Sequence, residues 1–184
     1  MARIFLVLAG LNALALLVAV LSGTLSWFRE GLMHPEEPSY LIHFVVGLTA
    51  VVGNLLVHCL VITYFLGTGR LIKEVTLAYQ LPDERWARPT RDIKRGNTPY
   101  AIVAMLLAIA TAAAGSGRQF QVWPAWIHLT LATIAFLGNL WVFRIEYRNL
   151  TRNIGILDEI MVEVERIRAE HGLPSSEEAF QRRY

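Results

Sequence analysis

The chain has 184 residues and a formal net charge of +2, and 54% of its residues are apolar whereas only 17% are charged. Soluble domains carry about 25% charged residues, so this composition argues against a soluble globular protein. Phosphate-binding glycine loops, nucleophile elbows and Cys-x-x-Cys pairs are absent from the sequence, and we expect no catalytic activity from the chain alone.

The first half of the chain predicts two membrane-spanning helices, at about 4–28 and 40–66. About 20 apolar residues in a helix cross a hydrocarbon core of roughly 30 Å. The Gly-Thr-Gly sequence at 67–69 then predicts a stop or a bend. Residues 70–81 place their apolar side chains on one face, which favours an amphipathic helix lying on the inner leaflet and ended by Pro82.

The second half predicts spans at about 98–114 and 124–147, each with a proline in its first turn. After the last span, apolar residues recur at intervals of four and three, which is typical of a coiled-coil seam. The seam consists of Leu150, Ile154, Leu157, Met161 and Val164. It predicts a helix that continues as far as Gly172 and either covers the inner loop of this protein or forms a dimer contact.

Basic residues are distributed unevenly among the connections and predict the orientation. Segment 67–97 holds seven Lys or Arg and the tail from Arg144 holds seven Arg, whereas 29–40 and 118–122 hold one each. Lys and Arg accumulate on the cytoplasmic side of short loops. We therefore expect a multi-pass protein of the inner (plasma) membrane with both termini in the cytoplasm. The basic residues then lie near lipid headgroups, and no nucleic-acid partner is expected.

A repeat links the second and fourth predicted helices. Both contain Ile-His, nine residues, then Gly-Asn-Leu-x-Val, beginning at Ile42 and at Ile127. The preceding helices each end with Ser-Gly, at 22–23 and at 116–117. The repeat predicts two tandem helical hairpins, 1–97 and 98–184, in an all-α four-helix transmembrane bundle with cytoplasmic amphipathic helices. The two copies of the motif then lie on a diagonal of the bundle.

The repeated polar residues are the candidate site. His43 and His128 fall at the same depth, and Asn54 and Asn139 follow eleven residues later on the same helix faces. If these faces point to the bundle axis, the two imidazoles meet near the outer end, where they could hold the iron of a b-type haem.

This pattern resembles, at the level of the fold, the four-helix core of membrane b-type cytochromes, in which two diagonal helices bear two histidines each. Here His58 follows His43 by 15 residues, but Phe143 stands at the matching position of the other helix. The resemblance therefore covers one complete ligand pair, His43 and His128, and implies one haem in an electron-transfer or membrane-anchor subunit. His58, Asn54 and Asn139 are secondary candidates.

Other interpretations stay open. The histidines could be interfacial residues and the asparagines interhelical hydrogen-bonding groups, in a cofactor-free accessory or scaffold subunit of a larger membrane complex. The partners would then be the bilayer and other membrane subunits, or a second copy bound through the C-terminal helix.

A metal or quinone site would add His34, Glu36 and Glu37 to the two histidines. Transport is disfavoured, because the predicted spans contain no Asp, Glu, Lys or Arg before Arg144 and Glu146, which are interpreted as anchors at the inner interface. Cys59 is interpreted as inert packing within its helix.

Overall fold

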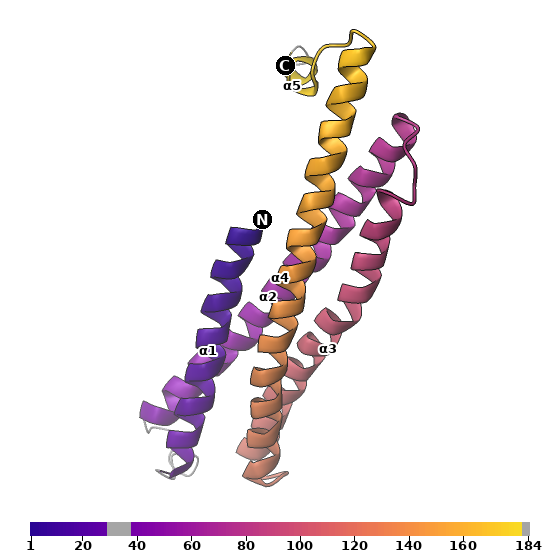
Figure 1. Ribbon diagram of the computed structural model, residues 1–184. Coiled ribbons are helices and arrows are strands. Elements are labelled where there is room, and N and C mark those ends of the chain that lie inside the picture. The colour runs from indigo at the N-terminus through magenta and orange to yellow at the C-terminus, as the bar shows by residue number, and fades with distance from the viewer. Residues whose placement is uncertain (29–37, 182–184) are drawn as a thin grey trace.

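The computed structural model describes residues 1–28 and 38–181, and its regular structure there is entirely helical. The helices are α1 (Ala2–Phe28), α2 (Pro38–Ala78), α3 (Ala87–Gln119), α4 (Ala125–Glu170) and the short α5 (Ser176–Gln181) (Figure 1). The first four are long and apolar enough to cross a membrane. The predicted all-α four-helix transmembrane bundle is therefore confirmed, and the chain is a multi-pass membrane protein.

The helices form a bundle in which neighbours in sequence are neighbours in space. Helix α2 packs against α1 and α3, and α4 packs against α3 and α1, so α2 and α4 lie on a diagonal as predicted. Helices α2, α3 and α4 continue past the first residue of α1, at the end of the molecule that carries α5 (Figure 1). The bundle therefore has a four-helix part and a three-helix extension.

Small and aromatic side chains fill the interior of the four-helix part. In α3, Ala101, Ala104 and Ala108 are buried, which lets the neighbouring helices approach closely. Phe5 of α1 meets Phe143 of α4 edge to face, with ring centroids 6.3 Å apart. Large apolar side chains that face outward are suited to lipid, which is as apolar as they are.

The glycines at 67 and 69 do not end α2, so the predicted stop is wrong. A glycine inside a helix costs about 1 kcal/mol, and tertiary contacts offset that cost here. Thr68 Oγ1 accepts a hydrogen bond from Asn153 Nδ2 of α4 at 3.0 Å. Helix α2 instead ends at Ala78, followed by Gln80 in the left-handed region with φ 53°. The backbone N–H of Leu81 then donates to Thr76 O, which closes the helix end.

Residues 70–81 are therefore not a separate helix on the leaflet. Up to Ala78 they continue α2, and their apolar face packs inside the extension, where Ile72, Trp86, Ala87 and Ile160 form a buried cluster. Apolar spacing alone could not distinguish a lipid surface from a neighbouring helix, because both bury the same face.

The predicted seam in α4 is displaced at two positions. Leu150 and Val164 are buried as expected, but Asn153 and Ile160 are buried in place of Ile154 and Met161. This face covers the turn between α2 and α3, because Ile160 packs against Trp86. Helix α4 ends at Glu170 and is followed by Gly172 with φ 65°, as the predicted stop required.

Helix α3 begins eleven residues before the predicted start. Pro89, not Pro99, occupies its first turn, and Pro99 lies inside the helix. The basic residues before the span are helical, and Arg91 pairs with Asp83 of the preceding turn at 2.6 Å. The hydrogen bonds from this guanidinium lower the pKa of the Asp83 carboxyl. Charged residues marked the edge of the apolar span, but they do not mark the end of a helix that extends beyond it.

Candidate functional site

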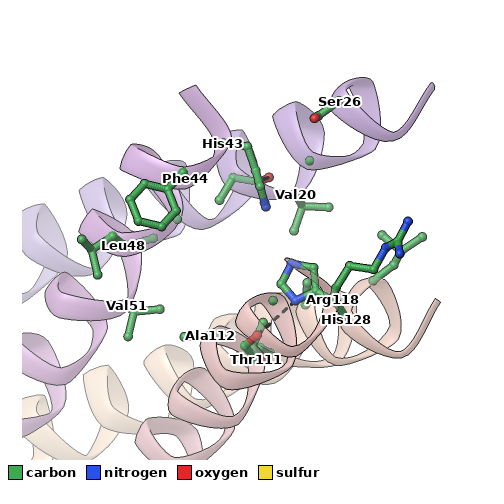
Figure 2. A pocket seen from close by; sticks show the side chains of 18 of the residues that line it. Val20, Ser26, His43, Phe44, Leu48, Val51, Thr111, Ala112, Arg118 and His128 are labelled. Carbon is green, nitrogen blue, oxygen red and sulfur yellow. Dashed lines mark hydrogen bonds between the residues drawn. The ribbon is translucent and has the colours of Figure 1, made fainter. Parts of the chain in front are cut away.

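The two repeated histidines face each other between the hairpins. His43 comes from α2 and His128 from α4, and their ring centroids lie 5.9 Å apart with the ring planes at 72°. Figure 2 shows the two rings pointing toward one another across a cavity. The juxtaposition expected from the repeat is therefore present.

Both rings are held by the same kind of backbone contact. Nδ1 of His43 lies 2.9 Å from the carbonyl oxygen of Ala19, and Nδ1 of His128 lies 3.0 Å from that of Thr111. A carbonyl oxygen can only accept, so Nδ1 carries the proton in each ring. Nε2 then keeps a lone pair in both histidines, as a metal ligand requires.

A glycine stands beside each ring. A Cβ atom on Gly23 would lie 2.7 Å from Cε1 of His43, and one on Gly115 would lie 3.0 Å from Cε1 of His128. Both glycines therefore make room for an imidazole. They also extend the repeat into α1 and α3, where each follows the carbonyl that its histidine contacts by four residues.

This alignment differs from the one that the Ser-Gly pairs suggested. Gly23 corresponds to Gly115 and not to Gly117. The second glycine of α3 has another role, because a Cβ atom there would lie 1.7 Å from Nε1 of Trp123. The Ser-Gly match was therefore displaced by two residues.

The rings border a cavity of about 440 Å³ that receives side chains from all four long helices. Pockets for cofactors and small ligands usually have volumes of about 300–1,000 Å³ and are mostly apolar. Its apolar walls include Leu16, Val20, Leu48, Val51, Ala112 and Leu129. The cavity therefore has the volume and the apolar lining of a ligand pocket, with the two imidazoles on its wall.

Two buried polar atoms on the cavity wall have no hydrogen-bond partner within residues 1–28 and 38–181. They are Nε of Arg118 and Oγ of Ser26. Arg118 was expected in an outer connection, but it lies in the last turn of α3 and brings a positive charge to the cavity. A ligand with an anionic group would satisfy it. In the sequence, the one sign that Arg118 was unusual is that it stands alone between two uncharged stretches.

A second polar centre lies deeper in the bundle. His58 is fully buried, with Nδ1 2.9 Å from Oε1 of Glu146 and Nε2 3.0 Å from Oδ1 of Asn139. The interpretation of Glu146 as an interfacial anchor is therefore wrong, because that residue is 0% exposed and paired. Asn139, Glu146 and Asn153 are seven residues apart and therefore share one face of α4. This spacing could have indicated in the sequence that Glu146 belongs to a polar, inward face.

The two asparagines of the repeat do not bond to each other. Nδ2 of Asn54 lies 3.5 Å from the carbonyl oxygen of Ala104, whereas Asn139 donates to Ala135 and accepts from His58. The two copies of the repeat differ at this point. Phe143 stands where the second copy would have a matching histidine, and its ring stacks on that of His58 with centroids 5.3 Å apart. Both ring nitrogens of His58 are engaged, so it is not available as a further ligand.

The other candidates are placed as follows. Cys59 faces outward, with its Sγ 3.9 Å from Met105 Sδ, and is not packed inside the bundle. His34, Glu36 and Glu37 lie outside the described residues. Within 1–28 and 38–181 no group of three or more His, Cys, Asp or Glu side chains could hold a metal ion.

No family model, no curated protein and no solved structure matches this chain. Only the fold and the geometry of the two polar centres bear on what the protein does.

Proposed function

We propose that the protein binds one b-type haem between His43 and His128 and acts as an electron-transfer or anchor subunit in the membrane. The separation of the two rings carries this proposal. A metal at about 2 Å from one nitrogen of each imidazole places the two ring centres roughly 6 Å apart. The observed separation is 5.9 Å. The ring planes can differ in angle, because each ring can turn about its own metal–nitrogen bond.

The contacts around the rings support the same assignment. Metal-binding histidines commonly donate the second ring N–H to a carbonyl oxygen, which fixes the tautomer and the ring orientation. His43 and His128 both do so.

The number of protein ligands favours haem over a bare metal ion. Zinc sites use three or four protein ligands, whereas a porphyrin supplies its own equatorial nitrogens and needs two axial side chains at most. His43 and His128 would be these axial ligands, and Arg118 would pair with the propionate carboxylates. Bound haem supplies a one-electron Fe(III)/Fe(II) couple.

The distribution of basic residues supports an orientation for this site. With the termini and the three-helix extension in the cytoplasm, the histidine cavity lies toward the outer face of the membrane. The protein would then carry an electron at the outer side and contact partners in the bilayer or through its cytoplasmic helices.

An optical spectrum of the detergent-purified protein tests the haem. We expect the dithionite-reduced sample to show the sharp alpha band of a low-spin b-type haem. His43→Ala and His128→Ala should each abolish it, since each removes one axial ligand. His171→Ala is the matched control, because His171 is exposed after the end of α4 and should leave the spectrum unchanged.

Circular dichroism establishes that the variants remain helical. If wild-type protein from haem-sufficient cells shows no haem band and does not take up added haem, the proposal is wrong. A cofactor-free accessory role would then be the alternative, and mild-detergent purification should recover companion subunits with the protein.

A further inference from the structure

The His58–Glu146 pair is a buried titratable centre that the haem site does not use. Both side chains are 0% exposed and their polar atoms lie 2.9 Å apart. Asn139 defines the orientation of the imidazole. Its Nδ2 donates to the carbonyl oxygen of Ala135 at 2.7 Å, so its Oδ1 is the atom that faces His58 Nε2. Nε2 must therefore carry a proton.

The remaining proton lies between Nδ1 of His58 and Oε1 of Glu146. Whether it resides on the nitrogen or on the oxygen, the pair as a unit is neutral, which is the state that burial favours. Oε2 of Glu146 is buried and has no hydrogen-bond partner in the part of the chain that the structure describes. It is the free acceptor of the pair, and a second proton bound there would give the pair one positive charge.

We propose that this pair is a proton-binding site, which binds a proton at Glu146 Oε2 more tightly when an electron enters the histidine cavity. The inference rests on the proposed haem for the source of that electron. The electron brings one negative charge into the bundle and a proton, drawn from water, brings one positive charge, so each favours binding of the other. The 15 residues from His43 to His58 span about 22 Å of helix.

Coulomb's law at an effective dielectric constant of about 20 converts a separation of roughly 22 Å into a three- to fourfold effect on an equilibrium constant. By linkage, the two effects are equal. The proton raises the reduction equilibrium constant by the same factor as reduction raises the affinity for the proton. The coupling is therefore modest and measurable.

The surroundings leave few other groups that could take this proton. Phe143 covers one face of the His58 ring. On α2 the neighbouring titratable groups are Cys59, which faces outward, and Tyr64, whose hydroxyl accepts from Asn153. On α3, Tyr100 packs outward on Trp141.

The remaining titratable side chains also point away or lie far along the chain. Arg3 is the one charged side chain of α1. On α4, Arg144, Tyr147 and Arg148 are exposed.

Three buried amide oxygens offer positions for internal water. Among the described residues, Oδ1 of Asn12, of Asn54 and of Asn153 has no hydrogen-bond partner. Buried polar atoms are normally satisfied, and internal water is the usual partner when the protein offers none. Asn12 donates to the carbonyl of Ala50, a residue of the cavity wall, and Asn54 lies one helical turn before His58 on α2.

Redox titration of the haem-loaded protein between about pH 5 and about pH 9 tests the inference. In the wild type we expect the reduction equilibrium constant to fall three- to fourfold as pH rises, or about 30 mV at about 59 mV per tenfold change. Glu146→Gln should remove this dependence, and Glu159→Gln, an exposed glutamate of α4, should retain it. Infrared difference spectra of reduced minus oxidised protein should show a carboxyl signal that Glu146→Gln lacks.

A second variant tests the pair if Glu146→Gln fails to fold. His58→Phe with Glu146→Val introduces the residues that stand at the matching positions of the other copy, Phe143 and Val61. In this double variant, too, the reduction equilibrium constant should not depend on pH. A wild type that shows haem but a flat potential, or a dependence unchanged in both variants, overturns the inference and leaves the haem proposal intact. A wild type without haem overturns both.

Discussion

At the scale of single residues, the position of each histidine ring depends on a glycine. That glycine lies one helical turn after the residue whose carbonyl oxygen contacts the ring. The carbonyl of Ala19 already accepts the N–H of Gly23 within α1, and that of Thr111 accepts the N–H of Gly115 within α3. A side chain on the residue four positions after that carbonyl would cover the second lone pair of the carbonyl oxygen. Glycine leaves it open, so the imidazole can reach it.

Replacing these glycines should therefore displace the imidazoles. In Gly23→Ala the new Cβ would lie 2.7 Å from Cε1 of His43, too close to be tolerated without a shift. We expect loss of most bound haem, measured as the haem-to-protein absorbance ratio. Gly115→Ala, with its nearest atom at 3.0 Å, should lose less.

The control for this pair is Gly10→Ala in α1, where a Cβ atom would have nothing within 4 Å. It should keep its haem and gain about 0.5–1 kcal/mol of helix stability. Full haem occupancy in Gly23→Ala would show that the ring contact is not needed.

At the scale of elements, α2 and α4 are longer than a membrane requires. They contain 41 and 46 residues, whereas about 20 suffice to cross the hydrocarbon core. The excess packs together beyond the span, where Trp86 is 2% exposed and Ile160 is 0% exposed. The extension therefore has its own core and continues the bundle outside the lipid.

Ile160→Ala should destabilise this extension by about 2–5 kcal/mol, because it empties a fully enclosed position. Thermal unfolding in detergent, followed by circular dichroism, measures the effect. Val162→Ala is the control, since Val162 is 72% exposed and exposed substitutions usually stay within about 0.5 kcal/mol. Equal melting of the two variants would mean that the extension is not a cooperative part of the fold.

At the scale of the whole molecule, four spans place both termini on one side of the membrane. Figure 1 shows the first residue of α1 and the end of α4 toward the same end of the bundle, with the turn between α3 and α4 at the other. From the distribution of basic residues we expect the first of these ends to face the cytoplasm.

Cysteine labelling tests this orientation in a Cys59→Ala background. Phe120 is 79% exposed beside the turn between α3 and α4, and Leu173 is 52% exposed after α4. An impermeant thiol reagent should label Phe120→Cys in intact cells, and Leu173→Cys only after the membrane is opened. The reverse labelling pattern would mean that the protein has the opposite orientation, with the histidine cavity on the cytoplasmic side.

The sequence by itself determined the four spans, the diagonal of α2 and α4, and the meeting of His43 and His128. Spans follow from the length of uncharged stretches, and the histidine pair follows from a repeat that keeps its register. Span length and the repeat are local properties of the chain, whereas the meeting of the rings also required that the repeated faces point to the bundle axis.

Only the tertiary structure decided what those helices contact. Thr68 continues α2 through two glycines because Asn153 lies opposite, and Glu146 is buried because His58 lies opposite. Gly23 became informative only once the imidazole beside it was placed. In each case the outcome depends on a partner far away in the chain, and the free energy of that contact outweighs the local preference.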